Sequence, residues 1–434
     1  MKVINPLRCF EEILKFYSNA IITSSAEDYA NRRKRLKLPV IPIPILESLL
    51  EYTADIFKEE PVLLKLNSPF IIVGDIHGHL LDLFRILKTF SLPPKVNYLF
   101  LGDLVDRGEF STETVSLFFI LKSLFPKNVY IVRGNHEFSE LCDRSGFYSE
   151  LLEIYDNPHL CQSFEFAFSH MPLAAVIDDS TLCIHGGIGP SFKDVKAIEE
   201  IKKPISDFHD NIVSDILWSD PSEIISMYIP SNRGTGNIFG QVALESFLEN
   251  SNLKNIIRGH QCVQAGCETI FDGKLTTVFS ASNYCGSIDN KAGVLLLNTK
   301  TETSQNASQN QNLSDLVKMK NNFRTFDPLP AFGRKDTNFL KSESEYQFSL
   351  PQHSLTLLSR LNTSKINQTK VPAPAPRRTS LKNQSIAALT RCLSDVTKNP
   401  PKERPILSKT SRETPKLRHK SVPISNPIVH RLSI

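Results

Sequence analysis

Six short polar blocks, each at the end of an apolar run, carry the side chains of this chain that could do chemistry. The blocks are GDIHG at 74–78, GDLVDRG at 102–108, RGNHE at 133–137, HGG at 185–187, RGHQ at 258–261 and SASNYC at 280–285. They supply carboxylate, imidazole and amide donors from Asp75, His77, Asp103, Asn135, His136, His185 and His260. Such donors suit manganese, iron or zinc rather than soft metals. A site built from them can hold two metal ions next to one phosphate.

Each block follows a strand-like apolar run. The runs are IIV at 71–73, YLFL at 98–101, VYIV at 129–132, LCI at 182–184, NII at 255–257 and TTVF at 276–279. Short apolar runs bounded by glycine are typical of buried strands. Loops at strand ends, held by a rigid sheet, are where α/β folds place their sites.

Helical spacing between these runs predicts the other layer of the fold. We expect helices at 45–60, 80–90, 112–125 and 145–155, and a last strand at 292–300. Helices alternate with strands along most of this stretch, and strands dominate after residue 250. This alternation predicts an α/β layered body.

In this order, the six blocks resemble the phosphoprotein phosphatase family of serine/threonine protein phosphatases, whose pattern is GDxHG, GDxVDRG, GNHE, HGG, RxH and SAPNYC. The likeness spans roughly residues 40–300 and includes MPLAA at 171–175, LWSDP at 217–221 and NRG with FG at 232–240. Ser282 stands where the family usually has Pro, in a loop and without removing a ligand. The resemblance implies a calcineurin-like metallophosphoesterase fold, with a central β-sandwich of mixed sheets flanked by helices and the metals at one edge.

The resemblance also implies a centre of two metal ions, either manganese or iron with zinc. The implied ligands are Asp75 and His77 for the first metal, Asp103 as the bridging carboxylate, and Asn135, His185 and His260 for the second. The implied residues around the substrate are His136 as general acid, Asp106 as the carboxylate that orients it, Arg107 and Arg233 as phosphate clamps, Tyr284 at the rim and Cys285 as a toxin-reactive thiol.

The chemistry of phosphate esters agrees with these roles. Phosphate monoester hydrolysis needs accelerations on the order of 10²¹. Two metals roughly 4 Å apart can clamp the attacking and leaving oxygens, and a bridging water loses its proton near neutral pH. The expected reaction is therefore hydrolysis of phosphoserine and phosphothreonine in proteins by direct attack of a metal-bridging hydroxide. Arg107 and Arg233 offer planar forks for phosphate oxygens, and a positioned His supplies the leaving group's proton.

Other interpretations stay open at this point. The chain could be another metallophosphoesterase that acts on nucleotides, or a pseudophosphatase that binds phosphoproteins without turnover. Asp106 could serve only a structural ion pair with Arg107. Residues outside the matched roles are interpreted as structural: His79, His170, His209, Trp218 and the core thiol Cys183.

Cysteine use and hydropathy indicate where the protein works. The eight cysteines are scattered along the chain, which is not a disulfide framework and fits a reducing compartment. The N-terminus, MKVINPLRCFEEILKF, lacks an apolar signal core, and no run approaches the roughly 18 apolar residues of a membrane span. We therefore expect a protein of the cytoplasm, the nucleus or both.

The formal net charge of +4 hides a split between −10 for residues 1–299 and +14 for residues 300–434. We predict a helical and basic N-terminal extension at 1–38, a catalytic domain at 39–300 and a low-complexity, disordered regulatory tail at 301–434. Within the tail, FRTFDPLPAF at 323–332 is a candidate exception, since its aromatic side chains could dock back on the body.

The expected partners follow from the resemblance and the charge. They are phosphoprotein substrates and regulatory or targeting subunits, with no membrane, and nucleic acid at most weakly through the basic tail. LWSDP and SASNYCG resemble the type 1 branch most closely, whose members recruit regulators through an apolar groove. The groove positions fall on Thr181, Asn255 and Thr269. Polar residues there would weaken an aromatic anchor by roughly 1–3 kcal/mol per lost apolar contact, so we predict divergent partner choice.

Overall fold

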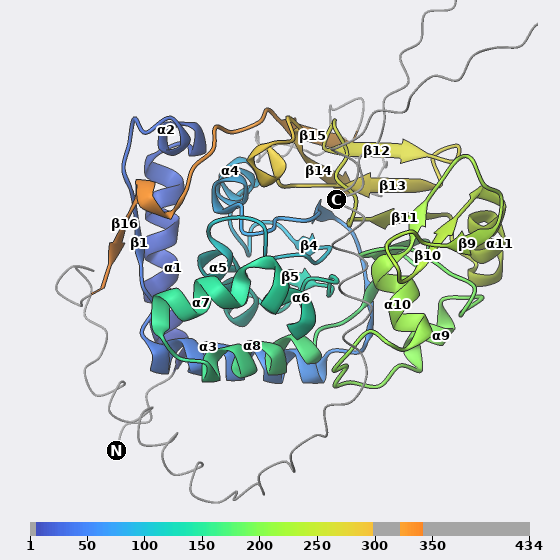
Figure 1. The fold of residues 1–434 in the computed structure, drawn as a ribbon, viewed down its shortest axis with the longest axis horizontal. Helices are drawn as coiled ribbons and strands as arrows, with labels where there is room; N and C mark the ends of the chain where they lie inside the picture. Colours follow the sequence, from blue (N-terminus) through green and yellow to red (C-terminus); the bar gives the residue numbers. More distant parts are fainter. Residues whose placement is uncertain (1–5, 298–321, 342–434) are drawn as a thin grey trace, which may run out of the picture. The chain divides into compact units, whose positions relative to one another are not determined.

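Two β-sheets form the centre of the fold in a computed structural model that describes residues 6–297 and 322–341 (Figure 1). The five-stranded sheet has the order β15-β14-β3-β4-β5, with bounds Phe323–Phe326, Ala292–Leu297, Phe70–Val73, Tyr98–Phe100 and Val129–Ile131. The six-stranded sheet has the order β12-β13-β11-β7-β6-β2, with bounds Cys267–Ile270, Leu275–Val278, Asn255–Arg258, Thr181–Ile184, Ala174–Ile177 and Leu63–Leu66. Each sheet contains both parallel and antiparallel pairs, which confirms the predicted mixed sheets.

Strand alternation explains how the two sheets stack. In β3, Phe70 and Ile72 belong to the apolar cluster between the sheets, whereas Ile71 and Val73 belong to the cluster that includes the helices. In β7, Cys183 faces the inner cluster and its two neighbours face outward. Successive strand residues point to opposite faces, so a strand covered on both sides must be apolar throughout. This accounts for the continuous apolar runs before each polar block.

Helices cover the outer faces of the sandwich (Figure 1). The cluster on the five-stranded sheet includes α1 (Pro6–Thr23), α2 (Ala26–Ala30), α3 (Ile43–Glu59), α4 (Leu80–Phe90), α5 (Ser111–Leu124), α6 (Ser139–Ser145), α7 (Phe147–Tyr155) and α8 (His159–Ser169). The cluster on the six-stranded sheet includes α9 (Lys196–Glu199), α10 (Asn211–Trp218) and α11 (Gln241–Ser251). Beside it lies a small sheet of β8 (Asp220–Pro221), β10 (Asn237–Phe239) and β9 (Tyr228–Pro230). The predicted helices are therefore present, within a few residues of their expected bounds.

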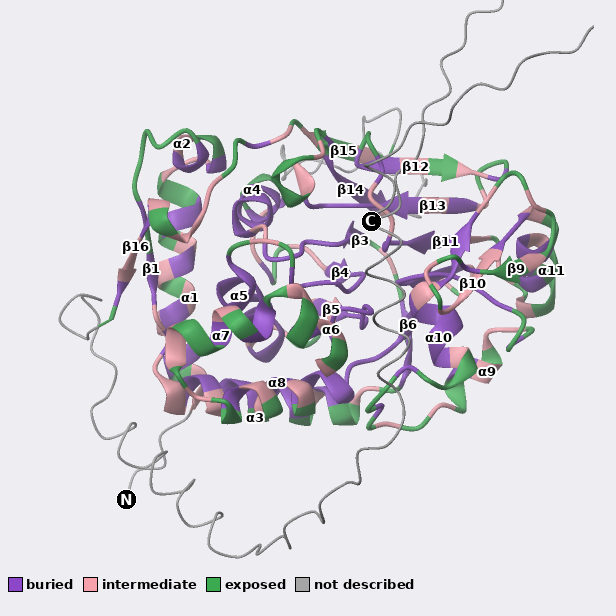
Figure 2. Cartoon of the chain, viewed as in Figure 1, coloured by how far each residue is buried: buried purple, intermediate pink, exposed green. Residues whose placement is uncertain are grey.

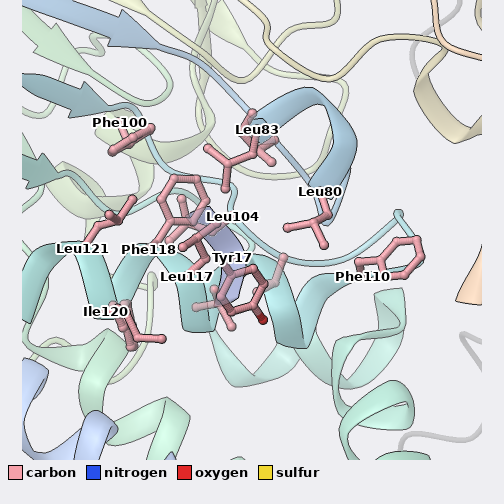
Figure 3. Packing of buried hydrophobic residues seen from close by; sticks show 14 of the residues in the cluster. Tyr17, Leu80, Leu83, Phe100, Leu104, Phe110, Leu117, Phe118, Ile120 and Leu121 are labelled. Atoms are coloured by element: carbon pink, nitrogen blue, oxygen red, sulfur yellow. The ribbon is translucent and has the colours of Figure 1, made fainter. Parts of the chain in front are cut away.

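The core beneath α5 is tightly filled. This helix is buried along nearly its whole length, as its colour in Figure 2 shows. Its residues Leu117 and Phe118 belong to the same cluster as Tyr17 of α1 and Leu80 and Leu83 of α4 (Figure 3). Because α5 begins just after the GDLVDRG block, this packing gives that block a rigid support.

The N-terminal segment packs against this core. The buried residues of α1 include Phe10, Ile13, Tyr17 and Ile21, at the three- and four-residue spacing of an amphipathic helix. The ring of Tyr17 meets Phe84 edge-on at 6.2 Å. The basic sequence NRRKRLK at 31–37 overlaps the start of β1 (Leu36–Pro39), and this strand pairs in parallel with β16 (Thr337–Leu340).

The described part of the predicted tail, residues 322–341, also lies on the body, and we name it the C-terminal strap. It contains β15, the 3₁₀ turn η2 (Arg334–Asp336) and β16. Phe326 and Phe332 pack against the helical core, so the docking expected for the aromatic side chains of 323–332 is present. Phe339 of β16 packs there as well, although it lies beyond the segment for which docking was expected. The boundaries of the three predicted regions stay predictions, and 298–321 and 342–434 lie outside the described residues. Within 6–297 and 322–341, no helix combines the length and apolar character needed to span a membrane.

Candidate active site

The strand ends bring the polar blocks to one edge of the sandwich. β3 precedes Asp75 and His77, β4 precedes Asp103 and Asp106, β5 precedes Asn135 and His136, β7 precedes His185, and β11 precedes His260. Backbone pairing between Asp75 and Phe279 joins the two sheets at this edge, and the N–H of Ser280 donates to the carbonyl of Asp75 at 3.0 Å. Both sheets therefore contribute to one site.

The loops of the site turn sharply and pass close to one another. His77, Asp103, Asp106, Arg107 and His260 all adopt positive φ, a conformation that non-glycine residues rarely take and that clusters at functional sites. Two glycines are needed for the close approach. A Cβ at position 134 would collide with the carboxylate of Asp103, and one at position 259 would collide with that of Asp75.

Two groups of potential metal ligands share Asp103. His77, Asp103 and His136 form one, and Asp103, His185 and His260 form the other, each with ligand atoms within 4.8 Å of one another. His77 Nε2 lies 3.3 Å from one Asp103 oxygen, and His185 Nε2 lies 3.3 Å from the other. Asp103 therefore lies between the two groups, and its role as the bridging ligand stays a prediction.

The remaining predicted ligands lie beside these groups. Asp75 Oδ2 is 3.8 Å from His77 Nε2, and Asn135 Oδ1 is 2.8 Å from His185 Nε2. His260 Nδ1 is 3.2 Å from the same nitrogen of His185. All six predicted ligands therefore converge. The structure adds His136 to the first group, although the resemblance implies that it is the general acid.

The hydrogen bonds of the imidazoles test whether metal ions fit here. His77 Nδ1 lies 2.9 Å from the carbonyl of Val105, and His185 Nδ1 lies 2.8 Å from that of Leu101. A carbonyl only accepts, so each Nδ1 carries the proton and each Nε2 faces the carboxylates. In a neutral histidine of this tautomer, Nε2 carries a lone pair, which here faces the lone pairs of carboxylate oxygens. Positive charge between them removes the repulsion, so the donor set fits cations.

The electrostatics of the buried groups agree. Burial raises the pKa of Asp75 to about 7, so its charge is poorly compensated by protein groups. Burial lowers the pKa of His77 to about 3, which leaves its Nε2 free to ligate. Burial also opposes charge on His185, yet the carboxylate of Asp103 outweighs it and raises that pKa to about 9. A proton thus supplies positive charge where a cation would bind in its place.

His136 is arranged differently from the other histidines. Its Nδ1 donates to Asp106 Oδ2 at 2.7 Å, and its ring stands perpendicular to that of His77, with centroids 4.7 Å apart. Burial disfavours the imidazolium, but the carboxylates of Asp103 and Asp106 outweigh burial and raise the pKa of His136. The other oxygen of Asp106 accepts the N–H of Phe147 at 2.9 Å. Both oxygens of Asp106 are thus engaged by groups other than Arg107.

The predicted substrate residues surround this centre. Arg233 Nε donates to Asp220 Oδ2 at 2.7 Å, and Asp220 also pairs with the buried Arg258 at 3.0 Å. Arg107 is exposed to solvent. The ring of Tyr284 lies 5.2 Å from that of His77.

Glu137 supports the site, although the sequence motifs assigned it no role. Glu137 is fully buried and accepts N–H groups of Asp103, Leu104 and Gly134 at 2.9, 2.7 and 2.8 Å. It thereby fixes the loop of the shared carboxylate. Its place beside His136 in the RGNHE block was the available signal.

Three of the residues interpreted as structural, His79, Trp218 and Cys183, make contacts that agree with this interpretation. His79 Nδ1 lies 2.9 Å from the carbonyl of His77, so this ring is used by the loop itself. Trp218 packs between Phe208 and His260, with its ring centroid 5.7 Å from that of His260. Cys183 is fully buried, and burial raises the pKa of its thiol.

The fold and the converging ligands define a metallophosphoesterase, and comparison with known proteins agrees. Residues 68–264 match the family of calcineurin-like phosphoesterases. A serine/threonine-protein phosphatase of Schizosaccharomyces pombe is 39% identical over 259 residues, which cover 59% of this chain and 84% of that protein. A protein phosphatase 2A catalytic subunit of Dictyostelium discoideum is 36% identical over 284 residues, with 65% and 91% covered.

A solved structure extends the agreement to the fold. It is a serine/threonine phosphatase from Saccharomyces cerevisiae with similarity to human phosphatase PP5, at 30% identity and a TM-score of 0.58, covering 67% of this chain and 92% of that one. The chain therefore belongs to the phosphoprotein phosphatase family of serine/threonine protein phosphatases. This membership favours a protein phosphatase over the nucleotide-directed and non-catalytic alternatives. Placement in the type 1 branch stays a prediction.

Proposed function

We propose that this chain hydrolyses phosphoserine and phosphothreonine in proteins at the edge where its two sheets meet. One observation carries the proposal: two groups of metal-binding side chains share Asp103, and a histidine held by Asp106 stands beside them. Asp75, His77, Asp103, Asn135, His185 and His260 would hold two metal ions. Bound ions would supply Lewis acidity that polarises the phosphoryl group and lowers the pKa of water toward neutral, which favours hydrolysis.

The protein's own part begins with binding the phosphate. Arg233 presents its guanidinium with Nε already anchored on Asp220, so less freedom is lost when the remaining N–H groups meet phosphate oxygens. Arg107, which is exposed, would be the second guanidinium that clamps the phosphate. Paired charge-assisted hydrogen bonds of this kind give both energy and orientation.

The leaving oxygen is the second problem. As the bond from phosphorus to the ester oxygen breaks, the departing alkoxide is a strong base and needs a proton. His136 would give its Nε2 proton to that oxygen, while Nδ1 stays bonded to Asp106. Asp106 keeps the ring oriented and stabilises its charged form before transfer, as the raised pKa of His136 indicates.

Metal identity, partners and location belong to the same proposal. The mixed oxygen and nitrogen ligands suit manganese, or iron with zinc. We propose that regulatory or targeting subunits direct the enzyme to its phosphoprotein substrates in the cytoplasm, the nucleus or both.

The experiment that tests the function is turnover by the purified chain, with metal analysis of the same preparation. We expect two bound ions per chain and release of phosphate from phosphoserine and phosphothreonine peptides. A dinucleotide substrate in parallel distinguishes the alternative metallophosphoesterase activity. Tight phosphopeptide binding without any release of phosphate would instead indicate a pseudophosphatase.

Partner choice has its own test. Thr181 and Asn255 pair across neighbouring strands β7 and β11, and Thr269 lies exposed on β12. If the type 1 groove lies here, its polar lining should bind a standard type 1 docking peptide about 5–150-fold more weakly than a groove with apolar residues, because one large apolar contact is worth roughly 1–3 kcal/mol. Titration of the peptide against the wild type and a Thr269→Phe variant measures this. Tight binding to the wild type would refute divergent partner choice.

A further inference from the structure

Arg334 of the C-terminal strap contacts the two helices, α5 and α7, that begin next to Asp106, the partner of His136. Its guanidinium binds Glu113 of α5 through two hydrogen bonds, at 2.7 and 2.9 Å, and Glu150 of α7 through one at 3.3 Å. Glu113 and Glu150 both stand in the first turn of their helices. The side chains of Arg334, Glu113 and Glu150 are 20%, 5% and 10% exposed, so water weakens these pairs little.

Glu150 in turn caps the start of α5. Its two oxygens accept the N–H groups of Ser111 and Thr112 at 3.0 and 2.8 Å. These are the first residues of a helix whose preceding residue, Phe110, gives no side-chain cap. A carboxylate from α7 therefore satisfies the free N–H groups of α5, and this joins the two helix starts.

Asp106 lies between the same two helix starts. Its backbone N–H donates to the hydroxyl of Ser111 at 3.0 Å, and its carboxylate accepts the N–H of Phe147, the first residue of α7, at 2.9 Å. Any shift of α5 relative to α7 would therefore move Asp106, and with it the ring of His136.

Aromatic contacts hold the strap in register at this point. Phe332 stacks on Phe110 at 5.8 Å, and the guanidinium of Arg334 lies 4.4 Å from the ring of Phe339. Arg334 is thus fixed from both sides, although it lies outside all six sequence blocks.

We propose that Arg334 is a positioning residue for the general acid. It clamps the first turns of α5 and α7 together, and these hold Asp106 in line with His136. Without the guanidinium, two buried carboxylates would repel each other across the joint. Burial and the charge of Glu113 raise the pKa of Glu150, and the charge of Arg334 opposes them and favours the carboxylate. Loss of Arg334 would thus weaken the carboxylate cap on α5.

This inference rests on the proposed function, because it concerns proton donation to the leaving oxygen. A comparison of two substrates isolates that step. The alkoxide of phosphoserine needs a proton, whereas the phenolate of p-nitrophenyl phosphate leaves without one. A misplaced acid should therefore slow the peptide far more than the aryl ester, and kcat more than KM.

The test uses the full-length chain loaded with manganese. Arg334→Gln should lower kcat for a phosphoserine peptide by about tenfold and change KM by less than about twofold. The loss is smaller than the roughly 10²–10⁴-fold that a general acid contributes, because the acid is displaced and not removed. Turnover of p-nitrophenyl phosphate should fall less than about threefold. Arg334→Lys restores charge without the planar fork and should recover part of the loss.

The matched control is Arg32→Gln. Arg32 also binds the strap, through Asp336 at 3.0 and 2.9 Å, but it does not reach Glu113 or Glu150 in the described contacts. It should leave the ratio of the two substrates unchanged. Equal losses on both substrates with Arg334→Gln, or no greater loss than with Arg32→Gln, would overturn the positioning role.

A second variant keeps the test decisive if Arg334→Gln does not fold. Ser111→Ala removes only the hydroxyl that accepts the N–H of Asp106, and it should produce the same selective loss on the peptide. If Ser111→Ala changed turnover of the peptide and of p-nitrophenyl phosphate by the same factor, the proposed link from Arg334 through the two helix starts to Asp106 would be wrong. A wild type inactive on both substrates would instead defeat the proposed function, and the positioning role with it.

Discussion

The two sheets contribute halves of the site that hold their histidines in different ways. On the five-stranded side, His77 and His136 each fix one ring nitrogen by a hydrogen bond, to the carbonyl of Val105 and to Asp106. On the six-stranded side, His260 Nε2 has no hydrogen-bond partner among the described residues, and its ring rests against Trp218. His185 is fixed by Leu101, which follows β4 of the other sheet. The five-stranded half thus supports itself, and the other half depends on it and on packing.

This difference shows how one edge serves two chemical tasks. The pKa of His77 is lowered to about 3 and that of His136 is raised, although the two rings lie 4.7 Å apart. Burial acts on both rings alike. At His136 the carboxylates of Asp103 and Asp106 together outweigh burial and favour the imidazolium. At His77, burial and the charge of His136 outweigh Asp103, so this ring stays neutral and can ligate a metal.

The largest effect should come from the residue that joins the halves. Asp103→Asn removes the charge shared by both ligand groups, and we expect no measurable turnover and loss of both ions. Metal analysis and phosphate release measure the result, with the exposed Glu223→Gln as the matched control. If Asp103→Asn kept two ions and normal turnover, the two halves would not form one centre.

The second prediction separates the two possible roles of His136. The geometry groups it with His77 and Asp103, yet its Nδ1 is occupied by Asp106. As a general acid, His136→Asn should lower kcat on a phosphoserine peptide by roughly 10²–10⁴-fold and keep both ions bound. Metal content and kcat are measured on the same sample. Loss of one ion would make His136 a ligand.

The third prediction compares the two arginines. Arg233→Ala should raise KM by roughly 10–100-fold, since hydrogen bonds to charged groups are worth about 1.5–3 kcal/mol. Arg107→Ala should raise it less, because its exposed side chain must be ordered on binding, whereas Arg233 is anchored on Asp220 at 2.7 Å. Steady-state kinetics on one peptide give both values. A larger effect at position 107 would reverse this order.

Most of the site could be predicted from the sequence because its residues sit in short blocks directly after strands. Asp75, Asp103 and His185 could be identified as candidate site residues from the positions of the strand ends and from the order of the polar blocks. A local sequence pattern does not predict contacts between residues that are far apart in the chain. Arg334 meets Glu150 only because β15 and β16 bring the strap back onto the helices.

The contact of Trp218 with His260 was equally hidden. A tryptophan at the end of α10 has the pattern of core packing, and packing is what it provides. That this packing falls on a predicted ligand depends on how the helix is placed against β11. Only the assembled fold determines that placement.

The smallest effect should come from loss of the contact between Trp218 and His260. Variants of Trp218 compare the contribution of ring packing with that of hydrogen bonding. Trp218→Ala removes the ring that supports His260 and should weaken manganese binding by about tenfold, at the low end for residues that orient a ligand. Trp218→Phe keeps an aromatic surface and loses only Nε1, which has no hydrogen-bond partner among the described residues, so it should bind as the wild type does. Manganese titration of the metal-free chain measures both, with turnover at saturating metal as the check that the fold is intact. Equal weakening in the two variants would mean that the indole nitrogen, rather than the packed ring, holds His260 in place.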